Sequence, residues 1–223
     1  MRTHETSWGA VLTSRPWLPL AILLAFAGCR EPTAPPIAPR VLGEVESLAT
    51  VDSGLHVLQQ ALGAPPLETY QVSFWAYRGQ ASTVQVNYQP AAGDTAGRPF
   101  LRFDIPEKGL RAGPDGVRLQ QGDSVFITLT IDSVAFSVDF QPSGVEFSNH
   151  FPASLTLWYE NANPDLNGDG VVDDADQVLL QQLAVWCRPT GTRSWFMLSS
   201  NNDATLPSIS TALYHFSEYA LSW

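Results

Sequence analysis

Positive charge is scarce in this sequence. The chain has 12 Lys and Arg residues against 22 Asp and Glu residues, which gives a formal net charge of -10, and Lys108 is its sole lysine. Nucleic acids and anionic membrane surfaces bind basic patches through their phosphates, so this balance argues against both kinds of partner. Acidity of this kind favours solubility and affinity for cations.

Catalytic motifs are also missing. The chain contains no G-x-S-x-G, H-E-x-x-H or S-x-x-K sequence. Its histidines (His4, His56, His150 and His215) are too sparse for a zinc site. Cys187 lies among apolar residues, so we expect a buried small hydrophobe rather than a nucleophile, and the fold needs no disulfide. We therefore expect a protein that is not an enzyme.

The apolar run at the N-terminus is too short to cross a bilayer. Residues 17–27 follow Arg2 and Arg15, and the run ends in the sequence F-A-G-C, whose cysteine is Cys29. A charged start and small residues before a cysteine resemble the leader of bacterial lipoproteins. The resemblance implies that residues 1–28 are a signal peptide and that acylated Cys29 anchors the protein in the cell envelope. An ordinary secretory leader with an incidental cysteine is the alternative, and both predict export.

Composition divides the rest of the chain into three parts. Residues 29–45 are rich in proline and are expected to form an extended, semi-rigid linker. Residues 46–69 lack a tight apolar period and are expected to be a connector, with room for a short helix. From residue 70 onward, short segments alternate between apolar and polar residues and are separated by turn residues, which is typical of an antiparallel β-sandwich.

Alternation predicts the individual strands. Residues 71–77 and 84–88 flank the turn at 78–80 and are a hairpin candidate. Apolar residues at odd positions of 124–132 share one face, and those at even positions of 134–140 share another. The remaining predicted strands are residues 100–105, 145–147, 153–159, 183–187, 194–198 and 212–223. The predicted fold class is all-β.

Acidic residues gather in residues 165–176, D-L-N-G-D-G-V-V-D-D-A-D. Aligned with the calcium loop of EF-hands, this stretch supplies side-chain oxygens at positions 1, 3, 5, 9 and 12 and a backbone carbonyl at position 7. Gly170 falls where the loop turns sharply, and Val172 is expected to face inward. A polar turn is the alternative. The predicted ligands of one Ca²⁺ are Asp165, Asn167, Asp169, Val171 (backbone), Asp173 and Asp176.

The last position of this loop departs from signalling EF-hands. Asp176 stands where those proteins carry a bidentate Glu, and with the D-x-N-x-D-G opening it resembles the loops of bacterial dockerin modules. A dockerin has two such loops with helices, whereas this chain has one. We therefore expect a calcium-stabilised connection in a β-domain, with about two helical turns over residues 176–182 and a dissociation constant of roughly 10⁻⁴ to 10⁻³ M.

Three stretches carry a second resemblance. They are F-D-I-P-E-K-G-L at residues 103–110, V-D-F-Q-P-S-G-V-E-F at 138–147 with P-A-S-L-T-L at 152–157, and H-F-S-E-Y-A at 215–220. Their order and spacing resemble the ZU5-like domains of ankyrins, netrin receptors and bacterial surface proteins. The resemblance covers roughly residues 100–223. It implies a β-sandwich that serves as a non-catalytic interaction module, with the calcium loop inserted in a strand connection.

The third of these stretches resembles a self-cleavage motif found in certain ZU5-containing innate-immune proteins. In that chemistry Ser217 would attack the carbonyl of Phe216 while His215 assists proton transfer, and water would open the resulting ester. The favoured alternative is that His215 and Phe216 pack and pair in the last strand. Self-cleavage also needs strained backbone, which a sequence does not reveal.

Tryptophan raises one further alternative. Trp75, Trp158, Trp186 and Trp195 lie on or beside predicted strands, and exposed tryptophan rings stack on sugars. Core packing is favoured, because aromatic residues are strand formers and large core fillers. Two or more of these rings on one exposed face would favour carbohydrate binding instead.

Taken together, the sequence predicts an exported, lipid-anchored module of the cell surface that binds calcium and has a structural or interaction role. Calcium is the expected cofactor, and a cell-surface protein or a polysaccharide is the expected further partner. A carbohydrate-binding or dockerin-like docking module is one alternative, and a self-cleaving domain is the other.

Overall fold

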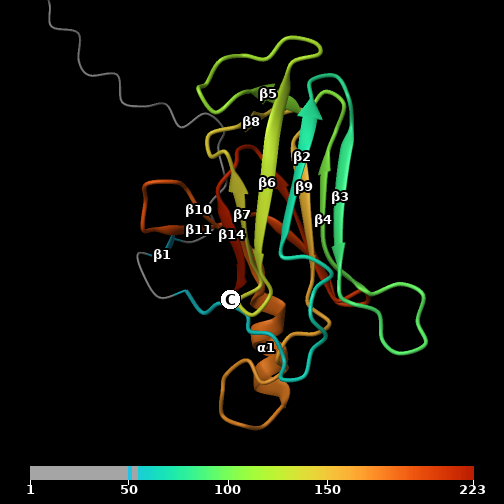
Figure 1. Ribbon diagram of the computed structural model, residues 1–223. Coiled ribbons are helices and arrows are strands. Elements are labelled where there is room, and N and C mark those ends of the chain that lie inside the picture. Colours follow the sequence, from blue (N-terminus) through green and yellow to red (C-terminus); the bar gives the residue numbers. More distant parts are fainter. Residues whose placement is uncertain (1–49, 52–54) are drawn as a thin grey trace, which may run out of the picture. The chain divides into compact units, whose positions relative to one another are not determined.

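Short strands with alternating apolar residues form two antiparallel sheets that pack face to face (Figure 1). The computed structural model describes residues 50–51 and 55–223, which fall within the compact unit Val41–Trp223. The predicted leader, Cys29 and the proline-rich linker lie outside the described residues. Over the described part of the chain, the all-β antiparallel sandwich predicted from the sequence is confirmed.

The larger sheet has seven strands in the order β1-β11-β10-β14-β7-β6-β2, and every neighbouring pair is antiparallel. Strand β14 lies in the middle of this sheet, between β10 and β7. The strands are β1 (Thr50–Val51), β2 (Gln71–Tyr77), β6 (Ser124–Asp132), β7 (Ser137–Gln141), β10 (Ala184–Arg188), β11 (Trp195–Met197) and β14 (Glu218–Ser222).

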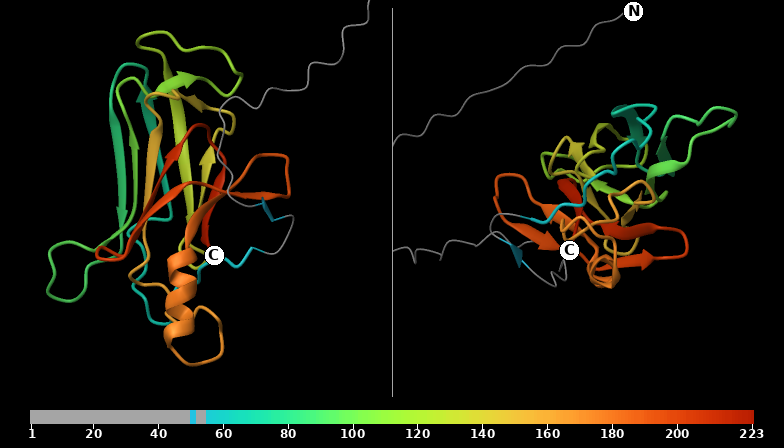
Figure 2. Two further views of the ribbon diagram at one scale, coloured as in Figure 1. Left: turned by 180° about the vertical axis from the view of Figure 1, so that it is seen from behind. Right: turned by 90° about the horizontal axis from the view of Figure 1, so that it is seen from below.

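The smaller sheet has five strands in the order β12-β13-β9-β4-β3, and a two-stranded ribbon pairs β5 with β8. These strands are β3 (Ser82–Asn87), β4 (Pro99–Ile105), β5 (Leu110–Ala112), β8 (Glu146–Phe147), β9 (Ala153–Trp158), β12 (Ser200–Asp203) and β13 (Ser208–Leu213). One helix, α1 (Asp174–Gln182), lies beyond the ends of the strands (Figures 1 and 2). No helix among the described residues has the length and apolar character to cross a bilayer.

Phenylalanine rings fill the space between the two sheets. Phe103 of β4 and Phe140 of β7 come from opposite sheets, and their ring centroids lie 4.8 Å apart. Phe216 stacks on Phe140 at 5.0 Å and meets Phe147 edge-on at 5.1 Å. All of these rings are essentially inaccessible to solvent. Burying large rings is the main favourable term available to such a fold, so this cluster ties the sheets together.

The predicted hairpin between β2 and β3 does not form. Strand β2 pairs with β6 in the larger sheet, and β3 pairs with β4 in the smaller one. The turn at 78–80 therefore carries the chain from one sheet to the other, and Gly79 adopts a φ of +91° within it. Both strands have one apolar face, so alternation alone does not distinguish pairing side by side from packing face to face.

Two other strand predictions are wrong in part. Residues 133–136 form a turn instead of the start of a strand, because the Asp132 carboxylate accepts the N–H groups of Val134 and Ala135. Val134 is consequently exposed, whereas Phe136 is buried. The predicted strand 212–223 is two strands of different sheets, β13 and β14, joined by residues 214–217.

The segment before β2 belongs to the sandwich. Leu58 and Leu67 are fully buried in the core. The backbone of residues 55–69 bonds to neighbouring elements, as the N–H of Leu58 does to the carbonyl of Leu221. The short helix considered for residues 46–69 is therefore absent from 55–69, where Pro65 and Pro66 also oppose it.

The outer face of the larger sheet carries a second apolar cluster at the β10 end. Trp186 and Trp195, which are 4% and 8% exposed, pack there with Ala184 and Ala220, and Leu55 and Val57 contribute to their cover. Core packing is thus confirmed for these two tryptophans. Trp158 of β9 is half-buried and Trp75 of β2 is exposed, so the four tryptophans do not gather on one exposed face.

Replacing a ring of the inter-sheet cluster should be far more costly than replacing a surface ring of the same sheet. We expect Phe140→Ala to lower the free energy of unfolding by about 3–5 kcal/mol, because it leaves a cavity among packed rings. Phe126→Ala on the outer face of β6 should cost less than about 1 kcal/mol. Urea denaturation of both variants measures the difference, and equal losses would contradict the assignment of faces.

Candidate functional site

The acidic loop follows β9, and its last three residues form the first turn of α1, so it lies between β9 and β10 as the sequence predicts (Figure 1). Helix α1 begins at Asp174, two residues earlier than expected, and ends at Gln182. Strand β10 follows almost immediately. The loop and its helix thus connect the smaller sheet, through β9, to the larger sheet, through β10.

The loop side chains bond to the loop's own backbone. The carboxylate of Asp165 accepts the N–H groups of Gly168 at 2.8 Å and Gly170 at 2.9 Å. Asn167 Oδ1 accepts the N–H of Asp169, and Asp169 Oδ1 accepts the N–H of Val171. Gly170 has a φ of +86°, as the sharp turn at its predicted position requires. Side-chain oxygens at predicted positions 1, 3 and 5 are therefore held by the turns of the loop.

Asp176 joins the two ends of the loop. Its carboxylate is 1% exposed and accepts the N–H groups of Leu166 (2.7 Å), Asn167 (3.1 Å) and Asp173 (2.9 Å). It also forms a capping box with Asp173 at the first turn of α1. The hydrogen bond from the N–H of Asp173 is the largest effect that lowers the pKa of the Asp176 carboxyl, and the N–H groups of Asn167 and Leu166 lower it further. Burial raises this pKa, but the hydrogen bonds outweigh it. Asp176 is thus a fixed carboxylate at the join of loop and helix.

The loop is rich in negative charge that has no cationic partner. Four ion pairs form in the described part of the chain, Arg98–Glu160, Arg102–Asp104, Arg111–Glu146 and Arg188–Glu218, and none of them involves the loop. Five aspartates fall within residues 165–176. Asp165, Asp169, Asp173 and Asp176 instead accept hydrogen bonds from backbone N–H groups of the loop and the start of α1.

The donor set of the loop suits a hard cation, because all of its donors are oxygens. Among residues 50–51 and 55–223, however, no group of three or more His, Cys, Asp or Glu side chains converges as a metal site. The predicted set also draws on the Asn167 amide and the Val171 carbonyl. One feature of the prediction is wrong: Val172 is 55% exposed and does not face inward.

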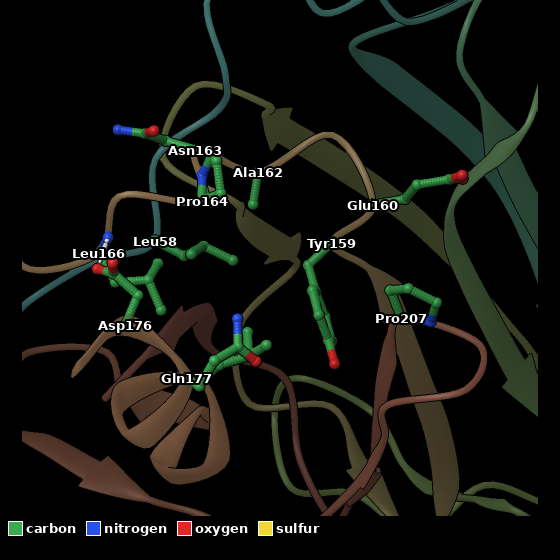
Figure 3. Close-up of a pocket in the computed structure, with 11 residues that line it drawn as sticks. Leu58, Tyr159, Glu160, Ala162, Asn163, Pro164, Leu166, Asp176, Gln177 and Pro207 are labelled. Atoms are coloured by element: carbon green, nitrogen blue, oxygen red, sulfur yellow. Dashed lines mark hydrogen bonds between the residues drawn. The ribbon is translucent and has the colours of Figure 1, made fainter. Parts of the chain in front are cut away.

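A cavity of about 200 Å³ lies between α1 and the sandwich (Figure 3). Leu166 and Leu180 nevertheless pack against the core beside it. Asp176 and Gln177 line the cavity from α1, and Leu58 and Tyr159 line it from the sandwich. Leu180 of α1 also lines it. Hydrogen bonds beside the cavity connect α1 to the sandwich.

Asn202 provides that connection. Its amide accepts a hydrogen bond from the Tyr159 hydroxyl at 2.8 Å and donates one to the Leu180 carbonyl at 3.0 Å. The helix is therefore attached through a few contacts and is not closely packed along its length.

His215, Phe216 and Ser217 lie in the crossover between the two sheets, not in the last strand as expected. Ser217 Oγ is 3.0 Å from His215 Nδ1, and the Phe216 carbonyl oxygen is 3.4 Å from the same nitrogen. The structure thus brings the three predicted residues together. Phe216 and Ser217 are each 2% exposed.

Burial controls the protonation of this cluster. It lowers the pKa of His215, against the opposing effects of the Phe216 backbone and Glu146, so the imidazole is neutral near pH 7. A neutral imidazole accepts the Ser217 proton when Nδ1 is the unprotonated nitrogen. Burial also raises the pKa of the Cys187 thiol to about 11. Cys187 is a free, buried thiol, as the sequence predicts.

The backbone of the crossover is ordinary. Among the described residues, Phe136 alone of the non-glycine residues has a positive φ. The N–H of Phe216 bonds to the Val145 carbonyl, and the carbonyl of Ser217 accepts the N–H of Phe140. These bonds anchor the crossover and leave no backbone strain of the left-handed kind at Phe216 or Ser217.

We expect the Asp176 carboxylate to stabilise the protein only when it is ionised. Its folded pKa lies below the ordinary value of 3.8, so its contribution is present above that pH and is lost as the pH falls through the folded pKa. Asp176→Asn should lower the melting temperature at pH 7 by several degrees, and this difference should disappear in acid. Asp174→Asn is the matched control at an exposed position of α1, and circular dichroism melts from pH 7 to pH 2 measure both. A constant deficit of the Asp176 variant at every pH would contradict this role.

Comparison with known proteins does not identify the chain: no family model, no curated protein and no solved structure matches it. The function must therefore be argued from the loop, the crossover and the sheet faces of the protein itself.

Proposed function

We propose that this protein is an exported, lipid-anchored surface module in which one calcium ion stabilises the connection between the two sheets. The proposed ligands are those predicted from the sequence, from Asp165 through Asp176. The observation that carries the proposal is a loop of successive Asx turns whose five aspartates have no cationic partner. A divalent ion would supply the missing positive charge.

The attachment of the loop supports a stabilising role for the ion. Asp176 connects both ends of the loop to α1, and α1 lies over a cavity with few contacts to the sandwich. An ion bound by the loop would hold the start of α1 and, through it, the start of β10. Binding to the folded chain alone raises the free energy of unfolding, so folding stability and free calcium are linked.

The remaining parts of the proposal follow from the sequence. Its N-terminal leader supports export and acylation at Cys29. The order of the three stretches that resemble ZU5-like domains supports an interaction module without catalytic activity. Under this proposal the protein presents a calcium-stabilised β-sandwich at the cell envelope, where its outer faces meet other molecules.

Calcium should raise the melting temperature of the parent protein. With a dissociation constant of roughly 10⁻⁴ to 10⁻³ M, calcium at about 10 mM adds about 1.4 to 2.7 kcal/mol to the free energy of unfolding. For a domain of this size that corresponds to a rise of several degrees. Calorimetric melts with calcium and with excess chelator measure the shift.

A pair of matched variants makes this test specific. Asp165→Ala combined with Asp169→Ala should abolish the calcium shift. Asp94→Ala combined with Glu107→Ala removes the same charge from exposed positions away from the loop and should keep the shift. Identical melting of the parent in calcium and in chelator would refute the calcium site.

Self-cleavage is the second candidate function, and the 3.0 Å contact between Ser217 Oγ and His215 Nδ1 favours it. In this reaction His215 takes the hydroxyl proton while Oγ bonds to the Phe216 carbonyl carbon. The bond from that carbon to the Ser217 nitrogen then breaks, and the nitrogen takes the proton. Water hydrolyses the resulting ester to a Phe216 carboxylate and restores the Ser217 hydroxyl. The ordinary backbone at the crossover favours the intact chain instead.

Mass spectrometry under denaturing conditions separates these two outcomes. Cleavage would release residues 217–223, most of which form β14 in the middle of the larger sheet and would remain bound in the native protein. Ser217→Ala should then give one intact species, and Ser210→Ala on β13 should cleave like the parent. A parent protein that shows the intact mass alone eliminates this candidate.

A further inference from the structure

The outer face of the larger sheet exposes a group of aromatic rings at its β2 end. Trp75 and Tyr77 of β2 are 54% and 39% exposed, and Phe126 of β6 is 47% exposed. Trp75 and Phe126 are direct cross-strand neighbours, and their ring centroids lie 5.1 Å apart. Figure 1 shows β2 and β6 side by side along their length. We call these three residues the aromatic patch.

The aromatic rings on this face are covered at one end of the sheet and exposed at the other. At the β10 end, Trp186 and Trp195 are buried beneath Leu55 and Val57. None of the chain that the structure describes covers the aromatic patch in this way. Large rings that a sandwich leaves uncovered on one sheet face commonly mark a binding surface.

Polar groups on the same two strands continue the patch. The outward-facing residues next to the rings are Ser73 and Thr128, whose hydroxyl oxygens lie 2.8 Å apart, and Gln71 and Thr130, whose side chains are 3.3 Å apart. Ser124 faces Tyr77 across the strands. The outer positions of β2 and β6 from Gln71 to Tyr77 and from Ser124 to Thr130 therefore carry rings, hydroxyls and an amide, but no charge.

We propose that the aromatic patch binds a neutral polysaccharide chain. A sugar ring presents apolar C–H groups on its faces and hydroxyls around its edge. Trp75 and Phe126 match the faces, and Ser73, Thr128 and Gln71 match the hydroxyls as donors and acceptors. A neutral ligand fits a patch without charge on a protein whose net charge is -10.

Charge and area both disfavour a second copy of the chain as the occupant. Two copies would each bring a net charge of -10 to the contact, which opposes association. Three rings that each span about 150–250 Å² offer roughly 200–350 Å² at these exposures. A stable protein interface needs about 800 Å² from each partner.

The angle between the rings indicates which form of polysaccharide fits. The planes of Trp75 and Phe126 are inclined by 52°, so both rings cannot lie flat on one planar crystal surface. Consecutive sugar residues of a single chain can rotate about their linkages to meet both rings. The patch therefore favours a soluble, individual chain over a crystalline polymer.

Affinity electrophoresis of the purified chain in gels that contain hydroxyethylcellulose, arabinoxylan or galactomannan tests the proposal. At least one of these neutral polymers should retard the protein, and Trp75→Ala and Phe126→Ala should each weaken the dissociation constant by about tenfold or more. Phe151→Ala, which removes a ring that is 44% exposed elsewhere, should leave retardation unchanged. All three variants should keep the melting temperature of the parent within a few degrees, because the rings are on the surface.

The proposal is overturned if none of the neutral polymers retards the protein, or if polygalacturonate alone does. It is also overturned if neutral polymers retard the Trp75→Ala and Phe126→Ala variants as strongly as the parent. If no neutral polymer binds and Trp75→Ala abolishes self-association in gel filtration, the patch binds a second copy of the chain instead. If no neutral polymer binds and Trp75→Ala abolishes sedimentation with phosphatidylglycerol vesicles, the patch binds a membrane instead. Because the patch does not involve the acidic loop, retardation should persist in excess chelator below the melting temperature. The calcium site and the aromatic patch can therefore fail independently.

Discussion

The contact between Phe103, Phe140 and Phe216 is the constraint on which the rest of this structure depends. These rings come from the smaller sheet, the larger sheet and the crossover between them. Burying them fixes which side of each strand faces inward, because side chains alternate along a strand. Once Val125, Ile127 and Leu129 face the core, Phe126 and Thr128 must face outward. The exposed aromatic patch is thus a geometric consequence of the core.

The same packing explains why the crossover holds a serine and a histidine in contact. Phe216 packs among the core rings, and this fixes the positions of its two chain neighbours, His215 and Ser217. Their 3.0 Å contact gives the buried Ser217 hydroxyl a hydrogen-bond partner in the half-buried His215 imidazole. One arrangement therefore serves packing and places a hydroxyl next to a base. Chemistry at this position would need additional strain, and the backbone supplies none of the left-handed kind.

The acidic loop lies outside the core and is governed by different physics. Its conformation is set by side chains that bond to backbone N–H groups within a few residues. Such local bonds can be inferred from sequence, because Asp, Asn and Gly favour particular turns. That is why the loop, the following helix and strand β10 were predicted close to their observed places. Val172 is the exception: the sequence predicts an inward side chain, but Val172 is 55% exposed and does not line the cavity beside α1.

Alternation in the sequence by itself determined the all-β class and most strand positions, and the spacing of Asp, Asn and Gly determined the acidic loop. All of these depend on residues near one another in the chain. The same alternation is present in β13, where Ile209, Thr211 and Leu213 are buried, so this strand too can be predicted from the sequence. Only the tertiary structure decided which strands pair, since β2 and β3 look like a hairpin yet belong to different sheets. It alone showed that Trp186 is buried and Trp75 is exposed, because Leu55 and Val57 from a distant part of the chain pack against Trp186 and its neighbours.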